Sequence, residues 1–122
     1  MNRGKAWYGV DFDGTLVEYD GYQGPGVYGD PIGPMVMRVK GWLQKGRRVK
    51  IFTARVSPNS DSQQDRDAAQ EDQSKIQDWC IEHLGVALEV TCEKDYKMIV
   101  LYDDRCRQVI KNTGKVVYRE NT

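Results

Sequence analysis

The chain has 122 residues, and its 18 basic side chains balance its 18 acidic ones. This length fits a single domain, which we expect to cover residues 1–122. A balanced charge argues against a general polyanion-binding protein, which would carry a basic excess, but it allows binding of one phosphate group. Apolar residues make up 39% of the chain, which is enough for one hydrophobic core.

Several features of the sequence indicate a cytoplasmic location. No apolar stretch is long enough to span a membrane, and residues 1–5 lead into a predicted strand without the apolar region of a signal peptide. The three cysteines, Cys80, Cys92 and Cys106, are widely spaced and form no CxxC pair. This spacing is typical of reduced thiols rather than of zinc ligands or disulfides. We therefore expect a cytoplasmic protein with no membrane partner.

Short apolar runs alternate with helical patterns along the chain. The predicted strands are residues 7–10, 49–52, 87–91, 99–102 and 116–118. The predicted helices run from the N-cap Asp30 to Gly46, along the stripe Ile76–Leu84 to Gly85, and over residues 106–112. The Ala/Gln/Glu-rich second part of residues 57–73 is a candidate start for the second of these helices. Residues 16–19 and 22–23 are predicted to form a β-hairpin flap that turns at Asp20–Gly21.

This alternation predicts an α/β fold with a mostly parallel, five-stranded, Rossmann-like sheet and helices on both faces. Ligands of such sheets bind at the carboxyl ends of the strands. The segments from Thr15 to Thr53 and from Thr53 to Lys94 are already occupied by predicted strands, helices and loops. We therefore expect no cap domain and an open site.

An acidic motif, Asp11-Phe12-Asp13-Gly14-Thr15, follows the first predicted strand. Residues two apart in an extended chain project to the same side, so the carboxylates of Asp11 and Asp13 can reach one point. Gly14 allows the backbone to turn sharply away after them. Taken alone, the motif is equally consistent with a solvated acidic turn.

Two other predicted strands end in polar residues. Thr53 ends the second strand, and a hydroxyl beside free backbone N–H groups can hold phosphate oxygens, although such a threonine often only satisfies local backbone. Asp103-Asp104 closes the fourth strand. Two adjacent acids at the end of a buried strand are costly unless a cation or hydrogen-bond donors neutralise them.

Together, these residues resemble the motifs of the haloacid dehalogenase superfamily of phosphohydrolases. Residues 11–15 resemble its first motif, Thr53 its second and Asp103-Asp104 its fourth, in that order along the chain. Lys94 resembles the lysine of the third motif, and Lys97, which lies closer to the apolar run, could take its place.

The resemblance implies a phosphatase that requires Mg²⁺. Asp11 would be the nucleophile that forms an aspartyl-phosphate, and Asp13 would be the general acid and then the general base. Thr53 would bind the phosphoryl group, and Lys94 would add positive charge beside the nucleophile. The metal ligands would be Asp11, Asp13 through its backbone carbonyl, Asp103 and Asp104. Substrate contacts would come from Gly14, Thr15, Ala54 and Arg55.

The substrate is expected to be a nucleotide, another phosphorylated small molecule or a nucleic-acid end. Residues 53–55 and 102–105 resemble the phosphatase part of polynucleotide kinase/3′-phosphatases. A signalling receiver domain is an alternative, but receivers have paired acids after the first strand and the phosphoacceptor in mid-chain, which is the opposite order. A module that binds phosphate without turnover is a second alternative. The oligomeric state is not predicted.

Overall fold

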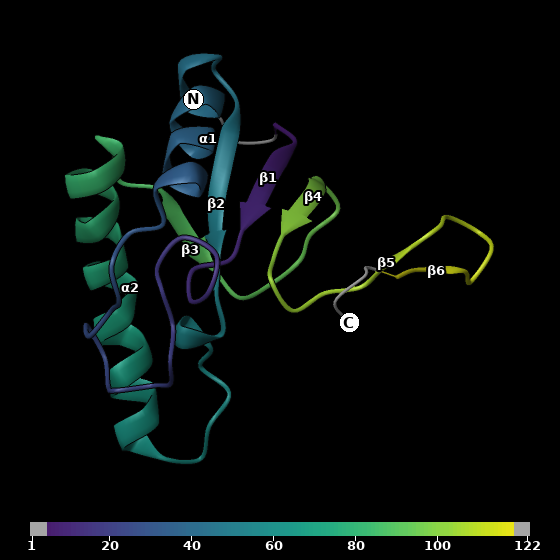
Figure 1. Ribbon diagram of the computed structural model, residues 1–122. Helices are drawn as coiled ribbons and strands as arrows, with labels where there is room; N and C mark the ends of the chain where they lie inside the picture. Colours follow the sequence, from purple (N-terminus) through teal and green to yellow (C-terminus); the bar gives the residue numbers. More distant parts are fainter. Residues whose placement is uncertain (1–4, 119–122) are drawn as a thin grey trace.

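The computed structural model describes residues 5–118 and has an α/β fold (Figure 1). Four parallel strands form one sheet in the order β3-β2-β1-β4. These strands are β1 (Trp7–Val10), β2 (Arg48–Phe52), β3 (Glu89–Thr91) and β4 (Met98–Tyr102). The helices are α1 (Gly33–Gln44), the short 3-10 helix η1 (Ala54–Val56) and α2 (Gln63–Leu84). The prediction of a parallel, Rossmann-like α/β sheet is confirmed, but that sheet has four strands rather than five.

Both α-helices cover the same face of the sheet. Val10 of β1 and Ile51 of β2 share one buried cluster with Val39 of α1 and Ile76 of α2. The two crossovers step in one direction, from β1 to β2 and from β2 to β3, which places their helices on one side. The prediction of helices on both faces is therefore wrong.

The opposite face is built around Trp7. Its indole N–H donates to Asp95 Oδ1 at 2.8 Å, and Lys50 Nζ lies 4.5 Å from the ring centroid. Lys50 also pairs with Glu89 and Asp95, at 3.7 and 3.5 Å. Asp95 belongs to the connection 92–97 between β3 and β4, so a loop, not a helix, covers this part of the sheet.

The last described segment differs from its prediction. The predicted helix 106–112 and the predicted strand 116–118 are replaced by a two-stranded antiparallel hairpin of β5 (Gln108–Val109) and β6 (Val116–Val117). Asn112 and Gly114 adopt positive φ values of 66° and 74° in its turn. The hairpin extends away from the four-stranded sheet (Figure 1).

The predicted flap over residues 16–23 does not form a hairpin. Instead, residues 16–18 run beside residues 30–32: Glu18 N–H donates to Asp30 O at 2.9 Å, and Ile32 N–H donates to Leu16 O at 2.8 Å. Residues 19–28 are a loop between these two segments. Since the Asp30 carbonyl is used in this pairing, α1 begins after Ile32, not after the predicted N-cap Asp30.

The second helix is longer than its apolar stripe suggested. Its N-cap is Ser62, whose hydroxyl accepts a hydrogen bond from Asp65 N–H, and it ends at Gly85 with φ 85°, as predicted. Within residues 5–118, no helix is long and apolar enough to cross a membrane.

Candidate functional site

Polar residues follow the carboxyl ends of three strands and therefore lie along the same edge of the sheet. Asp11 follows β1, Thr53 follows β2 and Asp103 follows β4. Asp11 N–H donates to Tyr102 O and Thr53 N–H donates to Thr91 O, both at 2.8 Å. These bonds extend the parallel ladder past the strand ends, so the polar side chains begin where the regular sheet stops.

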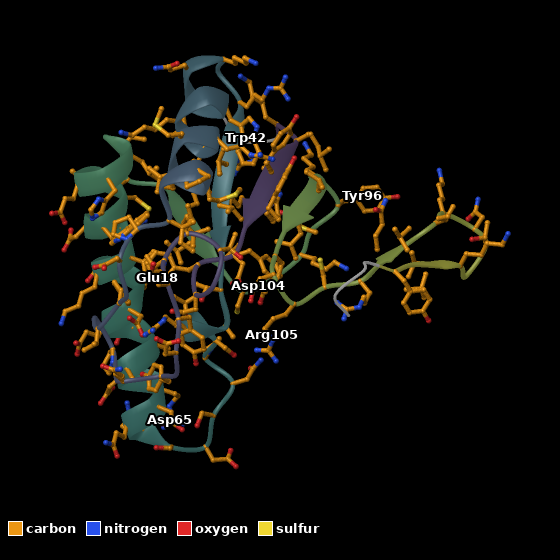
Figure 2. The ribbon with its side chains drawn as sticks, viewed as in Figure 1. Glu18, Trp42, Asp65, Tyr96, Asp104 and Arg105 are labelled. Atoms are coloured by element: carbon orange, nitrogen blue, oxygen red, sulfur yellow. The ribbon has the colours of Figure 1, made fainter. Side chains whose placement is uncertain are left out.

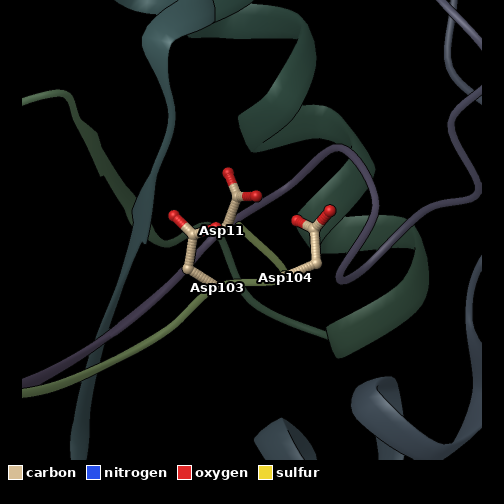
Figure 3. A group of neighbouring side chains, drawn as sticks. All are labelled: Asp11, Asp103 and Asp104. Carbon is tan, nitrogen blue, oxygen red and sulfur yellow. The ribbon is translucent and has the colours of Figure 1, made fainter. Parts of the chain in front are cut away.

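Asp11, Asp103 and Asp104 form an acidic cluster (Figure 3). One carboxylate oxygen from each lies within 4.8 Å of the other two. Burial, the charge of Asp103 and a hydrogen bond with Asp104 raise the pKa of Asp11 from 3.8 to about 7. The cluster therefore favours a proton or a cation between its carboxylates at neutral pH, and oxygen ligands of this kind suit Mg²⁺.

Backbone and side-chain contacts fix the position of Asp104. Thr15 Oγ1 donates to Asp104 Oδ1 at 3.2 Å. Gly14 has φ 83°, and a Cβ at this position would lie 2.7 Å from Asp104 Oδ2. The backbone conformation therefore favours glycine, and any side chain at this position would displace the carboxylate beside it.

Asp13 faces a different partner from the other acids. Its carboxylate accepts two hydrogen bonds from Arg55, at 2.6 Å from Nε and 3.0 Å from Nη2. The sequence predicted that the carboxylates of Asp11 and Asp13 reach one point, and both residues line the same cleft. The side chain of Asp13, however, belongs to an ion pair rather than to the acidic cluster.

Arg55 is enclosed by groups from three segments. Its guanidinium donates to the carbonyls of Gly24 and Val27, each at 3.3 Å, and lies 5.0 and 4.9 Å from the ring centroids of Tyr22 and Tyr28. Burial alone would lower the pKa of Arg55, but the hydrogen bonds and charge of Asp13 raise it above its ordinary value. The side chain is a fixed cation inside the site.

Asp72 of α2 is a functional candidate that the sequence analysis missed. It is 1% exposed and accepts hydrogen bonds from Tyr28 OH at 2.6 Å and Gly26 N–H at 3.0 Å. Its Oδ2 lies 3.6 Å from Arg55 Nη1 and has no hydrogen bond. Asp72 lies four residues before Ile76, so both side chains lie on the buried face of α2. An acid within an apolar helix stripe is the sequence feature that could have identified Asp72 as a candidate.

The remaining predicted residues differ in their relation to the site. Thr53 is buried and lines the cleft, and its hydroxyl accepts a hydrogen bond from Arg55 N–H at 3.2 Å. Ala54 also lines the cleft. Lys94 is exposed in the connection 92–97, and neither Lys94 nor Lys97 is among the described residues that line the cleft. The role of a lysine from this region stays a prediction.

A cleft of about 390 Å³ opens beside Asp11 and Asp13. The loop 19–28, η1, the first turns of α2 and the segment after β4 contribute its other walls. Figure 2 shows Asp104 and Arg105 on the segment that leaves β4, and Asp65 near the start of α2. A volume of this size is within the range that holds a small organic ligand.

Comparison with known proteins extends only to the fold. No protein-family model matches this sequence, and no curated protein sequence matches it. A similar solved structure is that of a conserved protein coded by a locus from Bacteroides thetaiotaomicron, with a TM-score of 0.50 and 19% sequence identity. The alignment covers 84% of this chain and 78% of that chain. At this identity, the likeness supports the α/β architecture alone.

Proposed function

We propose that this protein is a Mg²⁺-dependent phosphatase of the haloacid dehalogenase type that attacks phosphomonoesters with Asp11. The observation that carries the proposal is the meeting of Asp11 with Asp103 and Asp104 at the carboxyl edge of a parallel sheet. An ionised carboxylate needs neighbouring positive charge before it can approach a phosphate dianion. A cation between these three carboxylates is suited to that task.

The donor set fits a magnesium ion. Three carboxylates supply hard oxygen ligands, and burial together with the negative charge of Asp103 and Asp104 raises the pKa of Asp11, a charge that a divalent cation would offset. When bound, Mg²⁺ would neutralise charge on both the nucleophile and the phosphoryl oxygens. Asp11, Asp103 and Asp104 would hold it, together with the backbone carbonyl of Asp13.

The remaining steps would be carried by the side chains around Asp11. Asp11 attacks phosphorus and forms an aspartyl-phosphate while the bond to the leaving alcohol breaks. Asp13 would first take up a proton from solvent, would give that proton to the leaving alcohol, and would then take a proton from the water that hydrolyses the acyl phosphate. Arg55 fixes the Asp13 carboxylate through two hydrogen bonds, so proton transfer requires Asp13 to exchange at least one of them for the substrate.

We also propose that the enzyme has no cap domain and works in the cytoplasm. A non-catalytic phosphate-binding module or a receiver-like domain would use the same acids without turnover. The presence of a second acid, Asp13, within the cleft favours turnover, because binding alone needs no proton donor there.

The proposal is tested by following release of inorganic phosphate from an aryl phosphate with Mg²⁺ and with a chelator. We expect multiple turnovers with Mg²⁺ and none with the chelator. Asp11→Asn should lose all turnover while keeping its circular dichroism spectrum. Asp61→Asn, which changes an exposed acid outside the described cleft, is the matched control and should retain full activity. Stoichiometric phosphorylation without repeated release would instead indicate a receiver-like domain.

A further inference from the structure

The loop 19–28 is fastened to α2 at several points. Tyr28 OH and Gly26 N–H both donate to the buried Asp72 of α2. A Cβ on Gly26 would lie 2.5 Å from Cδ of Lys75, one helical turn further along α2, so the loop backbone lies directly on the helix. These contacts make the loop a fixed wall of the cleft.

Arg55 connects this wall to the catalytic side. It lies between the loop carbonyls of Gly24 and Val27 on one side and the carboxylate of Asp13 on the other. The charge of Asp72, 3.6 Å away, also faces it. Two carboxylates already neutralise the positive charge of Arg55. We therefore do not expect its guanidinium to bind a second substrate phosphate.

The walls of the cleft have side chains that can pack against a flat ring of a ligand. The loop contributes Tyr19 and Tyr22, whose residues are 46% and 56% exposed, and α2 contributes Ala68 and Ala69. Aromatic faces beside small side chains leave space for a flat group and offer it a stacking surface.

The charge of the cleft is unfavourable for a second anion. Besides the acids already assigned to metal binding and proton transfer, Asp65 of α2 lines the cleft. Arg105 is the one basic lining residue among the described residues that Asp13 and Asp72 do not already engage. A leaving group with hydroxyl or N–H donors would suit Asp65, whereas a polyanionic strand would be repelled.

We propose that the cleft selects a phosphomonoester with a single phosphate and a neutral, ring-bearing leaving alcohol of nucleoside size, and that loop 19–28, held through Asp72, is the wall that selects it. This inference rests on the proposed phosphatase function. It favours a small phosphorylated molecule over a nucleic-acid end. In this arrangement, Asp72 is a positioning residue that acts through Tyr28 and Arg55.

The substrate class is tested by comparing kcat/KM for four phosphomonoesters. Adenosine 5′-monophosphate and adenosine 3′-monophosphate carry one phosphate and a ring; glycerol 2-phosphate lacks the ring; adenosine 3′,5′-bisphosphate adds a second phosphate. We expect at least one adenosine monophosphate to exceed glycerol 2-phosphate in kcat/KM by roughly fivefold or more, the effect of one stacked ring. It should also exceed the bisphosphate, because the acidic cleft repels a second phosphate. A 5′-phosphorylated oligonucleotide that matches or exceeds the monophosphates would overturn the inference.

Two pairs of variants test the walls. Tyr22→Ala should raise KM for the preferred monophosphate with little change for glycerol 2-phosphate, whereas Tyr96→Ala, at a fully exposed tyrosine outside the described cleft, should change neither. Asp65→Asn should raise kcat/KM for the bisphosphate several-fold relative to kcat/KM for the monophosphate. Asp67→Asn, two residues away and outside the cleft, should leave this ratio unchanged. Unchanged substrate ratios in Tyr22→Ala and Asp65→Asn would contradict the assigned walls.

Asp72 is tested through Asp72→Asn, which keeps the size of the side chain and loses its charge. We expect KM for the monophosphate to rise while kcat for glycerol 2-phosphate changes much less. Equal losses of kcat/KM with both substrates would contradict a positioning role and would leave Asp72 a purely structural residue. Absence of turnover with every substrate, the aryl phosphate included, would remove the proposed function itself, whereas turnover without preference for a ring would remove only this inference.

Discussion

Gly14 offers a sharp test of the geometry around Asp104. Gly14→Ala would place a Cβ 2.7 Å from Asp104 Oδ2 at a residue with φ 83°. The left-handed backbone conformation alone costs a residue with a Cβ about 1–2 kcal/mol. Because the Asp104 carboxylate can rotate away, we expect the contact to displace that carboxylate rather than to add a large further cost. The stability loss should therefore stay near 1–2 kcal/mol, but the proposed metal site should lose one properly placed ligand.

Gly46→Ala is the matched control. Gly46 has φ 76°, and a Cβ there would meet nothing within 4 Å. In urea denaturation with a chelator present, both variants should show the same loss in the free energy of unfolding, about 1–2 kcal/mol. Added Mg²⁺ should stabilise the parent and Gly46→Ala equally, and Gly14→Ala less, because stabilisation by a ligand falls as its affinity falls. Equal Mg²⁺ stabilisation of all three proteins would refute the assignment of Asp104 as a ligand held beside Gly14.

Two further predictions concern stability. Between its ordinary pKa of 3.8 and its folded value of about 7, Asp11 keeps a proton in the folded state that it loses on unfolding; the metal-free protein should therefore lose stability as pH rises from about 4 to about 7. Urea denaturation of the parent and of Asp11→Asn in a chelator checks this, and the same pH slope in both would contradict it. Ile76→Ala truncates a fully buried side chain of α2 and should lower the free energy of unfolding by about 2–5 kcal/mol. Ile81→Ala, on the same helix but 54% exposed, should cost far less, and equal losses in thermal denaturation would contradict the placement of the core.

The strand ends were the most predictable part of the fold. Apolar runs that stop at a polar residue identified β1, β2 and β4, and with them the positions of Asp11, Thr53 and Asp103. The run of β4 was expected to be buried, but β4 is an edge strand whose Ile99 and Val100 are exposed. Parallel pairing then dictates that these residues share one edge, which is why the acidic cluster could be expected from sequence.

The last part of the chain was mispredicted because its apolar spacing is ambiguous. Cys106, Val109 and Ile110 follow one another at helical spacing, but Val109 and Val116 instead pair across a turn that contains Asn112 and Gly114. Short apolar runs do not separate helix from strand by periodicity, and β-branched residues beside a turn favour the strand.

Contacts between distant segments could not be derived from local pattern. Residues 16–23 were predicted to form a hairpin, because Asp20–Gly21 is a turn signal, but pairing of residues 16–18 with residues 30–32 prevails and leaves residues 19–28 as a loop. The ion pair of Arg55 with Asp13 and its approach to Asp72 depend on how that loop lies on α2. No local rule specifies such a placement, so the environment of Asp13 emerged only from the structure.

Asp11 should become phosphorylated during turnover. Mixing the protein with an aryl phosphate and Mg²⁺, quenching in acid within the first turnover and analysing peptides by mass spectrometry tests it directly. We predict the added mass of one phosphoryl group on the peptide that contains Asp11, and its absence in Asp11→Asn. Phosphate release at full rate with no phosphorylated peptide, or with the phosphoryl group on another residue, would contradict the account.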